Sequence, residues 1–258
     1  MANAVPPEAA RRLSTARSYP LNPMDAMTAL SRPSHGDAAP EWQALRSLAD
    51  HIYASLRSAI IYGRLAPGAR LTELEIARQF GASQAPVREA LLRLEREGLV
   101  ERRARSATYV APLVEDELLA LLAIRTTIER FAAERAAKTI TPEQCDALAA
   151  LVAAMRAAAA RDDIAALVEH DMRFHRRLCE WSGSAALVRA WSPLAAQIER
   201  FVAQTRRYFP DLAEVADSHE PLLAALRAHD GTAAAHLVEE HILLVWRRMG
   251  HGGPAPAP

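Results

Sequence analysis

Residues 72–98 have the sequence TELEIARQFGASQAPVREALLRLEREG, which predicts two short helices joined by a tight turn. Thr72 and Glu75 have the spacing of a capping box, so the first helix should begin directly after Thr72. Gly81 stands where a left-handed residue commonly ends a helix, and the hydroxyl of Ser83 can then cap the next helix. Two helices separated by so short a turn are typical of a helix-turn-helix.

The second of these helices should bury one face and expose the first residues of its opposite face to solvent. Pro86 falls in its first turn, where a missing N–H costs nothing. Apolar residues then follow at helical spacing, and these are Val87, Ala90, Leu91 and Leu94. Gln84 and Arg88 lie off this stripe, as they must if a recognition helix presents its first residues to base edges in the DNA major groove. The alternative is an ordinary helical hairpin in a globular core.

A hairpin of two strands is predicted directly after the second helix. Residues 99–111, LVERRARSATYVA, are too short and too rich in Val, Tyr and Thr for another helix, and the tip should lie at residues 105–107. A hairpin in this place is typical of a wing, whose arginines contact phosphate and orient the protein on DNA without reading sequence. The predicted DNA contacts are Ser83, Gln84, Arg88, Arg102, Arg103 and Arg105.

Two runs of sequence resemble the N-terminal winged helix of GntR-type bacterial transcription regulators. They are LAPGARLTELEIARQFGASQAPVREALLRLEREGLVERR (residues 65–103) and ATYVAPL (residues 107–113). The PG turn, the PVREAL helix and the EGLV junction keep the order and spacing of that family. The resemblance implies a DNA-binding regulator of transcription.

The chain departs from the family pattern at three positions. Family members usually carry Arg and Thr where this chain has Gln84 and Ala85, and Gly in the wing tip where it has Ala107. Arg88 is retained. Gln pairs well with adenine where Arg prefers guanine, so the departures indicate a different operator, with lost DNA binding as the alternative.

The fold class is predicted to be mainly α, with an N-terminal winged helix-turn-helix followed by an antiparallel all-α bundle of about six helices. Residues 42–112 hold eleven Arg against seven acidic residues, and residues 113–258 hold sixteen basic against twenty acidic residues. The basic excess coincides with the winged helix, as a nucleic-acid surface requires. The predicted segments are a disordered tail at 1–40, the DNA-binding domain at 41–112, the helical domain at 113–250 and a second disordered tail at 251–258.

Polar breaks divide the helical domain into about six predicted helices. Their ranges are 118–139, 142–161, 164–181, 185–206, 212–228 and 232–249. Cys145 and Cys179 are isolated in the sequence, which favours a reduced, cytoplasmic compartment. The N-terminus has no apolar segment typical of a signal peptide, and no apolar run is long enough to span a bilayer. We therefore expect a soluble protein with no membrane partner.

Four polar residues fall on helix faces that should be buried. Asp171 and His175 are four residues apart and share an apolar face, while His219 and His241 are in register with Leu and Val on two later helices. Any one of them is more often a hydrogen-bonded core residue, but four together favour a shared metal ion, because Asp with neutral His suits Zn, Ni or Fe. The adjacent Cys179 is interpreted as a core thiol. The remaining histidines of this domain should be solvated, namely His170, His229 and His236.

The pattern around these ligands extends the resemblance to the FadR branch of GntR regulators and its all-helical, FCD-type effector domain. It consists of Asp171, FH at 174–175, HEPLLAAL from His219, and His241. In that branch a metal held by Asp and three His lies beneath a pocket for a small carboxylic acid. The resemblance therefore implies one divalent transition metal per chain, with Zn favoured, and a small organic acid as effector. Pro221 is unusual so close to His219 and should kink or start that helix.

Arg125 is the candidate residue for binding the acid, because family members carry an Arg near the pocket at this place. The alternative is a surface Arg paired with Glu129 at i+4, and Arg206 and Arg207 are alternates. A homodimer is expected, since a symmetric dimer meets the two half-sites of a near-palindromic operator. The protein should not be an enzyme, because no separate general base or nucleophile is visible. A metal sensor and, less favoured, a metal-dependent hydrolase are the competing functions.

Overall fold

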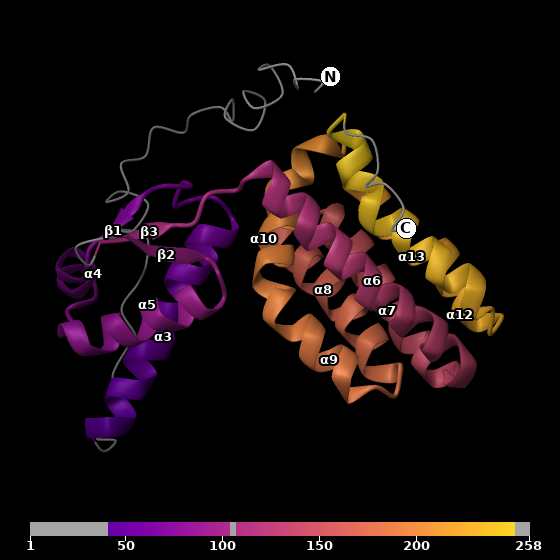
Figure 1. The fold of residues 1–258 in the computed structure, drawn as a ribbon, viewed down its shortest axis with the longest axis horizontal. Helices are drawn as coiled ribbons and strands as arrows, with labels where there is room; N and C mark the ends of the chain where they lie inside the picture. The colour runs from indigo at the N-terminus through magenta and orange to yellow at the C-terminus, as the bar shows by residue number, and fades with distance from the viewer. Residues whose placement is uncertain (1–40, 104–106, 251–258) are drawn as a thin grey trace, which may run out of the picture.

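The computed structural model describes residues 41–103 and 107–250, which fold into two lobes (Figure 1). Of the described elements, the N-terminal lobe holds the helices between residues 41 and 96 and the strands, and the C-terminal lobe is a bundle of helices. Both predicted disordered tails and the wing tip with Arg105 lie outside the described residues.

The N-terminal lobe contains the predicted helix-turn-helix. Helix α5 (Gln84–Arg96) packs on α3 (Glu41–Ile61), and α4 (Glu73–Phe80) packs on α5. Gly81 ends α4 in the left-handed region, at φ 59°. Apolar side chains of the three helices form one buried core, including Ile52, Leu56, Ile76, Phe80, Val87, Leu91 and Leu94.

The two predicted side-chain caps are wrong, although the helices begin where expected. Within the described chain Thr72 makes no capping bond, because its hydroxyl donates to the Glu75 carboxylate. The Ser83 side chain likewise makes no capping bond to a described residue. Two acidic residues, Glu73 and Glu75, occupy the first turn of α4, where negative charge complements the helix dipole and helps to fix the start.

The predicted hairpin is present as a wing. Strands β2 (Val100–Arg103) and β3 (Ala107–Val110) pair antiparallel, with Val100 opposite Val110. A third strand, β1 (Arg70–Leu71), adds to the other edge of β3 and gives the order β1-β3-β2. With two residues, β1 is too short to produce an alternating pattern, so the sequence did not predict it.

The C-terminal lobe contains the predicted helices, two of them interrupted. Its elements are α6 (Glu115–Thr139), α7 (Pro142–Ala159), α8 (Ile164–Trp181), α9 (Ala185–Trp191), η1 (Ser192–Leu194), α10 (Ala195–Thr205), η2 (Arg206–Tyr208), α11 (Ala213–Asp217), α12 (Glu220–Arg227) and α13 (Gly231–Arg248). The helix predicted at 185–206 breaks around Pro193, and the one at 212–228 breaks just before Pro221. Proline lacks the N–H that would continue a helical ladder and clashes with the preceding turn.

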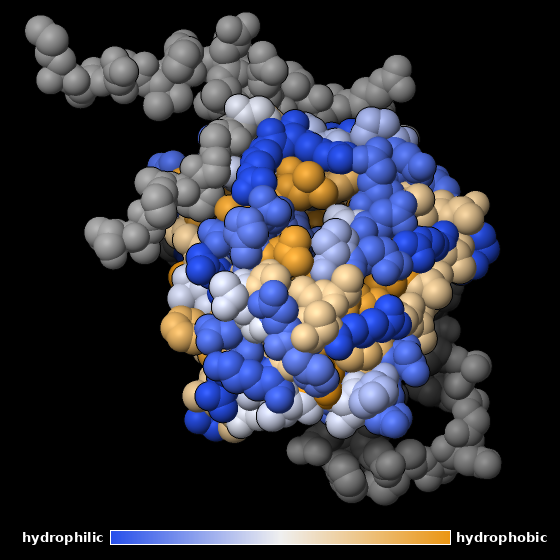
Figure 2. Space-filling view, turned by 90° about the vertical axis from the view of Figure 1, so that its right-hand side faces the viewer, coloured by the Kyte–Doolittle hydropathy of each residue, from blue (hydrophilic) through white to orange (hydrophobic). Residues whose placement is uncertain are grey.

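On the side away from the winged helix, the outer surface of the bundle is mostly hydrophilic, with scattered apolar residues (Figure 2). None of the helices in the described part of the chain is both long and apolar enough to cross a membrane.

Helix α10 joins the two lobes. The Arg57 guanidinium of α3 forms an ion pair with Glu199, with Nη2 and Oε2 2.6 Å apart. One turn later, Gln204 Nε2 donates to the Ile60 carbonyl at 3.0 Å, and Arg200 donates to the linker that follows β3. The helix that closes one side of the bundle is therefore bonded to the N-terminal lobe.

Candidate metal centre and adjoining pocket

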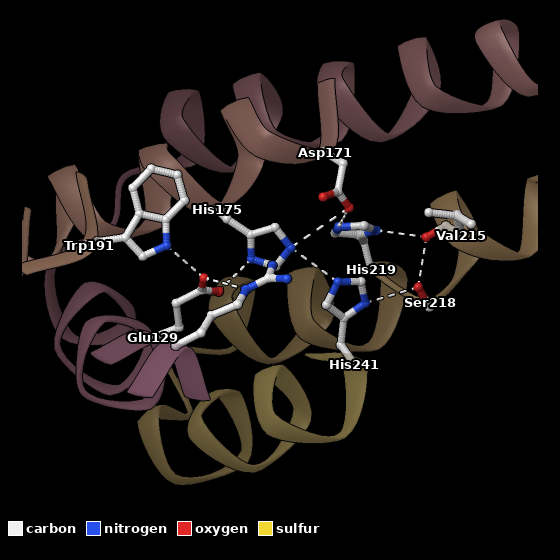
Figure 3. A network of polar contacts seen from close by, with 9 residues as sticks. Glu129, Asp171, His175, Trp191, Val215, Ser218, His219 and His241 are labelled. Atoms are coloured by element: carbon white, nitrogen blue, oxygen red, sulfur yellow. Dashed lines mark hydrogen bonds and ion pairs between the residues drawn. The ribbon is translucent and has the colours of Figure 1, made fainter. Parts of the chain in front are cut away.

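The four predicted metal ligands converge at the centre of the bundle (Figure 3). Asp171 and His175 come from α8, His219 from the turn before α12, and His241 from α13. One candidate ligand atom of each residue lies within 4.8 Å of those of the other three. Helix α12 begins at Glu220, directly before Pro221, in agreement with the prediction that this proline kinks or starts the helix. His219 is therefore the N-cap residue and not part of one continuous helix over 212–228, yet its ring is fully buried.

The Nε2 atoms of the three imidazoles point toward one another and toward Asp171. His175 Nε2 is 3.1 Å from His241 Nε2 and 3.8 Å from Asp171 Oδ1. His219 Nε2 is 3.3 Å from the same carboxylate oxygen. Nitrogen and oxygen atoms of this kind at this spacing match the donor set of a transition-metal site.

Each imidazole is oriented by a second contact at its Nδ1 atom. His175 Nδ1 is 2.6 Å from Glu129 Oε2, and His219 Nδ1 is 2.9 Å from the Val215 carbonyl. A carbonyl or carboxylate oxygen only accepts, so both Nδ1 atoms carry the proton. His241 Nδ1 is 2.9 Å from the hydroxyl of Ser218, whose own proton goes to the Val215 carbonyl, so His241 also donates through Nδ1.

These tautomers leave three Nε2 lone pairs and a carboxylate facing one another. Among the described residues, His219 Nε2 and Asp171 Oδ2 are buried without a hydrogen-bond partner. Lone pairs packed together in a dry interior repel unless a proton or a cation lies between them. A single metal ion satisfies all four groups at once, and the contacts at Nδ1 are those that orient metal-bound imidazoles in proteins.

The protonation states also suit metal binding. Burial lowers the pKa of His175, and burial together with the nearby His219 and His175 lowers the pKa of His241 well below its usual value. Burial alone would raise the pKa of Asp171, but its neighbours, the Arg125 guanidinium among them, outweigh burial and lower that pKa to about 2. Neutral imidazoles and an ionised carboxylate are the forms that bind a metal.

Glu129 is a functional candidate that the sequence analysis did not single out. It is fully buried in α6, where burial would raise its pKa, but Arg125 and His175 hold that pKa far below its usual range. Besides His175 it accepts from Arg125 Nε and Trp191 Nε1, both at 2.8 Å. The available signal in the sequence was its position seven residues, or about two turns, after Leu122, which places Glu129 on a buried face of α6.

Arg125 pairs with Glu129 as one interpretation predicted, but it does not lie at the surface. Its side chain is 3% exposed, and its Nη2 atom is buried with no hydrogen-bond partner in the part of the chain that the structure describes. Arg125 lines a pocket beside Asp171 and His241, with about 570 Å³ of empty volume that is partly open to solvent. Of the two alternates, Arg206 lines this pocket, while Arg207 is exposed and is not part of its lining.

The predicted DNA-contacting residues lie at the surface of the N-terminal lobe. Ser83, Gln84 and Arg88 are exposed at the start of α5. Arg88 is bonded to an acid of α4, with Nη2 2.7 Å from Glu73 Oε2. The wing residues Arg102 and Arg103 also have acidic neighbours, Glu95 and Glu101.

Other polar residues of the bundle lie outside the cluster. Cys179 is buried, as predicted, and burial raises the pKa of its thiol. His236 is exposed as predicted, while His229 is exposed but has its Nδ1 2.8 Å from the Ala137 carbonyl. His170 is only half exposed, and its Nδ1 is shielded from solvent, so the expectation of full solvation was wrong there.

Two family models match the two lobes. Residues 48–110 match the model described as bacterial regulatory proteins, gntR family, and residues 120–244 match the FCD domain. The chain is 34% identical over 183 residues to the probable D-xylose utilization operon transcriptional repressor of Paenarthrobacter nicotinovorans, which covers 71% of this chain and 80% of that protein. It is 29% identical over 191 residues to the HTH-type transcriptional repressor RspR of Escherichia coli (strain K12), covering 74% and 84% of the two chains.

The fold is similar to that of a solved structure described as E. coli McbR/YncC. The TM-score is 0.66 at 25% sequence identity, and the match covers 79% of this chain and 97% of that chain. The matching families and the relatives named above are transcriptional regulators rather than enzymes.

Proposed function

Because this chain belongs to the GntR family of bacterial regulatory proteins and carries an FCD domain, we propose that it is a ligand-responsive transcription regulator. Its C-terminal lobe binds one divalent transition metal and a small carboxylic acid, and the acid alters the affinity of the N-terminal lobe for its operator. The observation that carries this proposal is the inward-facing set of Nε2 atoms around Asp171, with unpartnered atoms among the described residues.

The proposed metal ligands are Asp171, His175, His219 and His241. Imidazole and carboxylate donors favour Zn, with Ni or Fe as further candidates. When bound, the ion would supply positive charge to a carboxylate in the adjoining pocket, and an ion that takes more than the four protein ligands would also supply open coordination positions. Glu129, Val215 and Ser218 keep the rings in the tautomer that presents Nε2 to the ion.

Arg125 is the proposed second anchor of the acid. Its Nε atom is held by Glu129, which leaves the unpartnered Nη2 of a rigidly oriented guanidinium at the pocket. A carboxylate that binds there forms a charge-assisted hydrogen bond and satisfies a buried donor. A pocket that joins a buried, unpartnered guanidinium to the metal ligands favours an organic effector over a protein that senses the metal alone.

Helix α5 is proposed to lie in the DNA major groove, with Ser83, Gln84 and Arg88 near base edges and the wing arginines near phosphate. A homodimer places two such helices on the half-sites of a near-palindromic operator. Operator DNA lies in the bacterial cytoplasm, where the buried free thiols of Cys145 and Cys179 also stay reduced.

The test combines elemental analysis with DNA binding. Protein purified without chelator should contain close to one equivalent of a transition metal per chain, and an operator selected from random duplexes should change affinity when an acid that stabilises the protein is added. Less than about a tenth of an equivalent of metal, with no uptake of added Zn or Ni, would exclude the metal site. A metal affinity in the range that fills and empties in cells would favour the sensor instead.

A further inference from the structure

The walls of the pocket are mostly apolar, and their polar side chains are three charged or imidazole groups beside the candidate metal site, two hydroxyls and the half-exposed Arg206. Helices α8, α10 and α13 and the segment around α11 contribute aliphatic side chains, among them Val168, Val202, Leu212, Leu244 and Val245. The charged groups at the inner end are Arg125, Asp171 and His241. A molecule that fills this space therefore meets charge at one end and hydrocarbon along its length.

The hydroxyl groups on the pocket wall are already committed to the protein. Thr205 Oγ1 donates to the Phe201 carbonyl at 2.7 Å, and Ser218 Oγ donates to the Val215 carbonyl at 2.7 Å. Ser218 also accepts from His241, so its bonding capacity is largely used. Among the described lining side chains, no hydroxyl proton is left to bond a polar substituent on a ligand tail.

The remaining cation of the lining lies in a different environment from Arg125. The Arg206 side chain is 54% exposed and lies 4.0 Å from Asp162, so water and a neighbouring carboxylate already accompany it. The buried and unpartnered Arg125 Nη2 is the group that gains most from a bound anion.

Resting on the proposed function, we propose that the effector is a monocarboxylate with an unsubstituted aliphatic or aromatic tail, and that sugar acids are excluded. The carboxylate faces Arg125 and the candidate metal ligands, and the tail lies against the walls formed by Val168, Val202 and Leu244. A hydroxylated tail of the same length would place hydroxyls against these aliphatic walls, and each one buried there without a partner lowers affinity by about tenfold or more.

Hexanoate and gluconate form a matched pair, because they share the carbon chain and the carboxylate and differ only in the hydroxyls. Isothermal titration of metal-loaded, full-length protein should give an affinity for hexanoate at least about a hundredfold above that for gluconate. Phenylacetate should also bind. Equal or tighter binding of gluconate overturns the proposed tail chemistry, and the regulator proposal still stands if gluconate then alters operator affinity. If neither kind of acid binds, the tail chemistry and the carboxylate effector are both wrong.

Variants of Val202 test whether the tail lies in this pocket. Val202→Phe fills the space and should lower hexanoate affinity by at least about tenfold, with metal content unchanged. Val188→Phe is the matched control, because Val188 is half-buried on α9 outside the pocket and should leave hexanoate binding unaltered. Val202→Ala is the milder variant if the larger side chain impairs folding, and it should raise the affinity for octanoate relative to hexanoate. Unchanged acid affinities in both Val202 variants would place the ligand elsewhere.

Discussion

Charged pairs at the recognition helix and in the bundle are built from the same residue types but lie in opposite surroundings. Arg88 and Glu73 are 56% and 28% exposed, whereas Arg125 and Glu129 are 3% and 0% exposed. An exposed pair contributes at most about 1 kcal/mol, so Arg88 can exchange Glu73 for DNA at little cost. Breaking a buried pair leaves an uncompensated charge and costs about 3–5 kcal/mol. The DNA surface is thus suited to changing partners, and the bundle interior to keeping them.

The largest effect is expected for Glu129→Leu. This substitution removes the shared acceptor of Arg125, His175 and Trp191 and should lower the free energy of unfolding by about 3–5 kcal/mol in urea titrations. Metal affinity should also fall by about tenfold or more, because His175 loses the contact that orients it. Glu73→Leu is the exposed counterpart and should cost less than about 1 kcal/mol. Similar losses in the two variants would break the distinction between the two regions.

Removal of the metal, or of one of its proposed protein ligands, should have the second-largest effect. Metal at about a hundred times its dissociation constant stabilises a folded protein by about 2.7 kcal/mol, so a chelator should lower the melting temperature measurably. His241→Ala should reduce metal affinity by at least about tenfold and abolish stabilisation by the acid, since His241 lies at both sites. Operator binding without effector should survive, because the winged helix has its own set of core contacts. Full metal occupancy in this variant would contradict the proposed ligand set.

The stability of the bundle should also depend on pH, because its buried imidazoles have lowered pKa values. The folded-state pKa values of His175 and His241 are lowered, so the unfolded chain takes up these protons first as the pH falls through about 6.5. The free energy of unfolding of chelator-treated protein should therefore be highest above that pH and decline below it, by at most about 1.4 kcal/mol per pH unit for each proton. His241→Gln should flatten the profile measured by urea titration, and His236→Gln, at an exposed site, should not. A profile that is flat between pH values of about 5 and 7 would exclude the buried neutral imidazoles.

A DNA-binding loss of similar or smaller size is expected for Arg88→Ala. Operator binding should weaken by about 1–3 kcal/mol, with the fold unaffected because the pair with Glu73 is exposed. Arg130→Ala on α6 serves as control, since it removes an equally exposed Arg from the other lobe. Fluorescence anisotropy at several salt concentrations measures both the affinity and its salt slope. Unchanged values would show that α5 does not dock as proposed.

The smallest effect is expected for Glu73→Gln. The Glu73 carboxylate competes with DNA phosphate for the Arg88 guanidinium. Removing its charge should therefore raise non-specific DNA affinity by less than about 1 kcal/mol. Glu75→Gln is the matched control, because the Glu75 carboxylate accepts from Thr72 and not from Arg88. A decrease in affinity for the Glu73 variant would indicate that this carboxylate positions Arg88 for base contact. The exposed pair would then keep its partner, as the buried pair in the bundle does.

The winged helix and the buried faces that carry the four candidate ligands were predictable because both depend on short-range periodicity, whereas the meeting of those four residues was indicated by their resemblance to the FadR branch. Gly81, the stripe from Val87 to Leu94, and the spacing of Asp171 and His175 follow from helical geometry alone. The missed role of Glu129 depends on contacts between segments distant in sequence, because it receives bonds from Trp191 and His175, which are more than forty residues away. The missing cap at Thr72 is a local effect, because the hydroxyl donates to the Glu75 carboxylate three residues away.

Helix α10 belongs to the bundle and also bonds to the N-terminal lobe. This arrangement has a thermodynamic consequence for the two binding sites. Its Val202 and Thr205 form part of the pocket wall, while Glu199 and Gln204 bond to α3. If acid binding shifts operator affinity through this helix, operator binding must shift acid affinity by the same factor. The protein on its operator would then respond to a different concentration of acid from the same protein free in the cell, so the number of operators would itself help to set the threshold of the response.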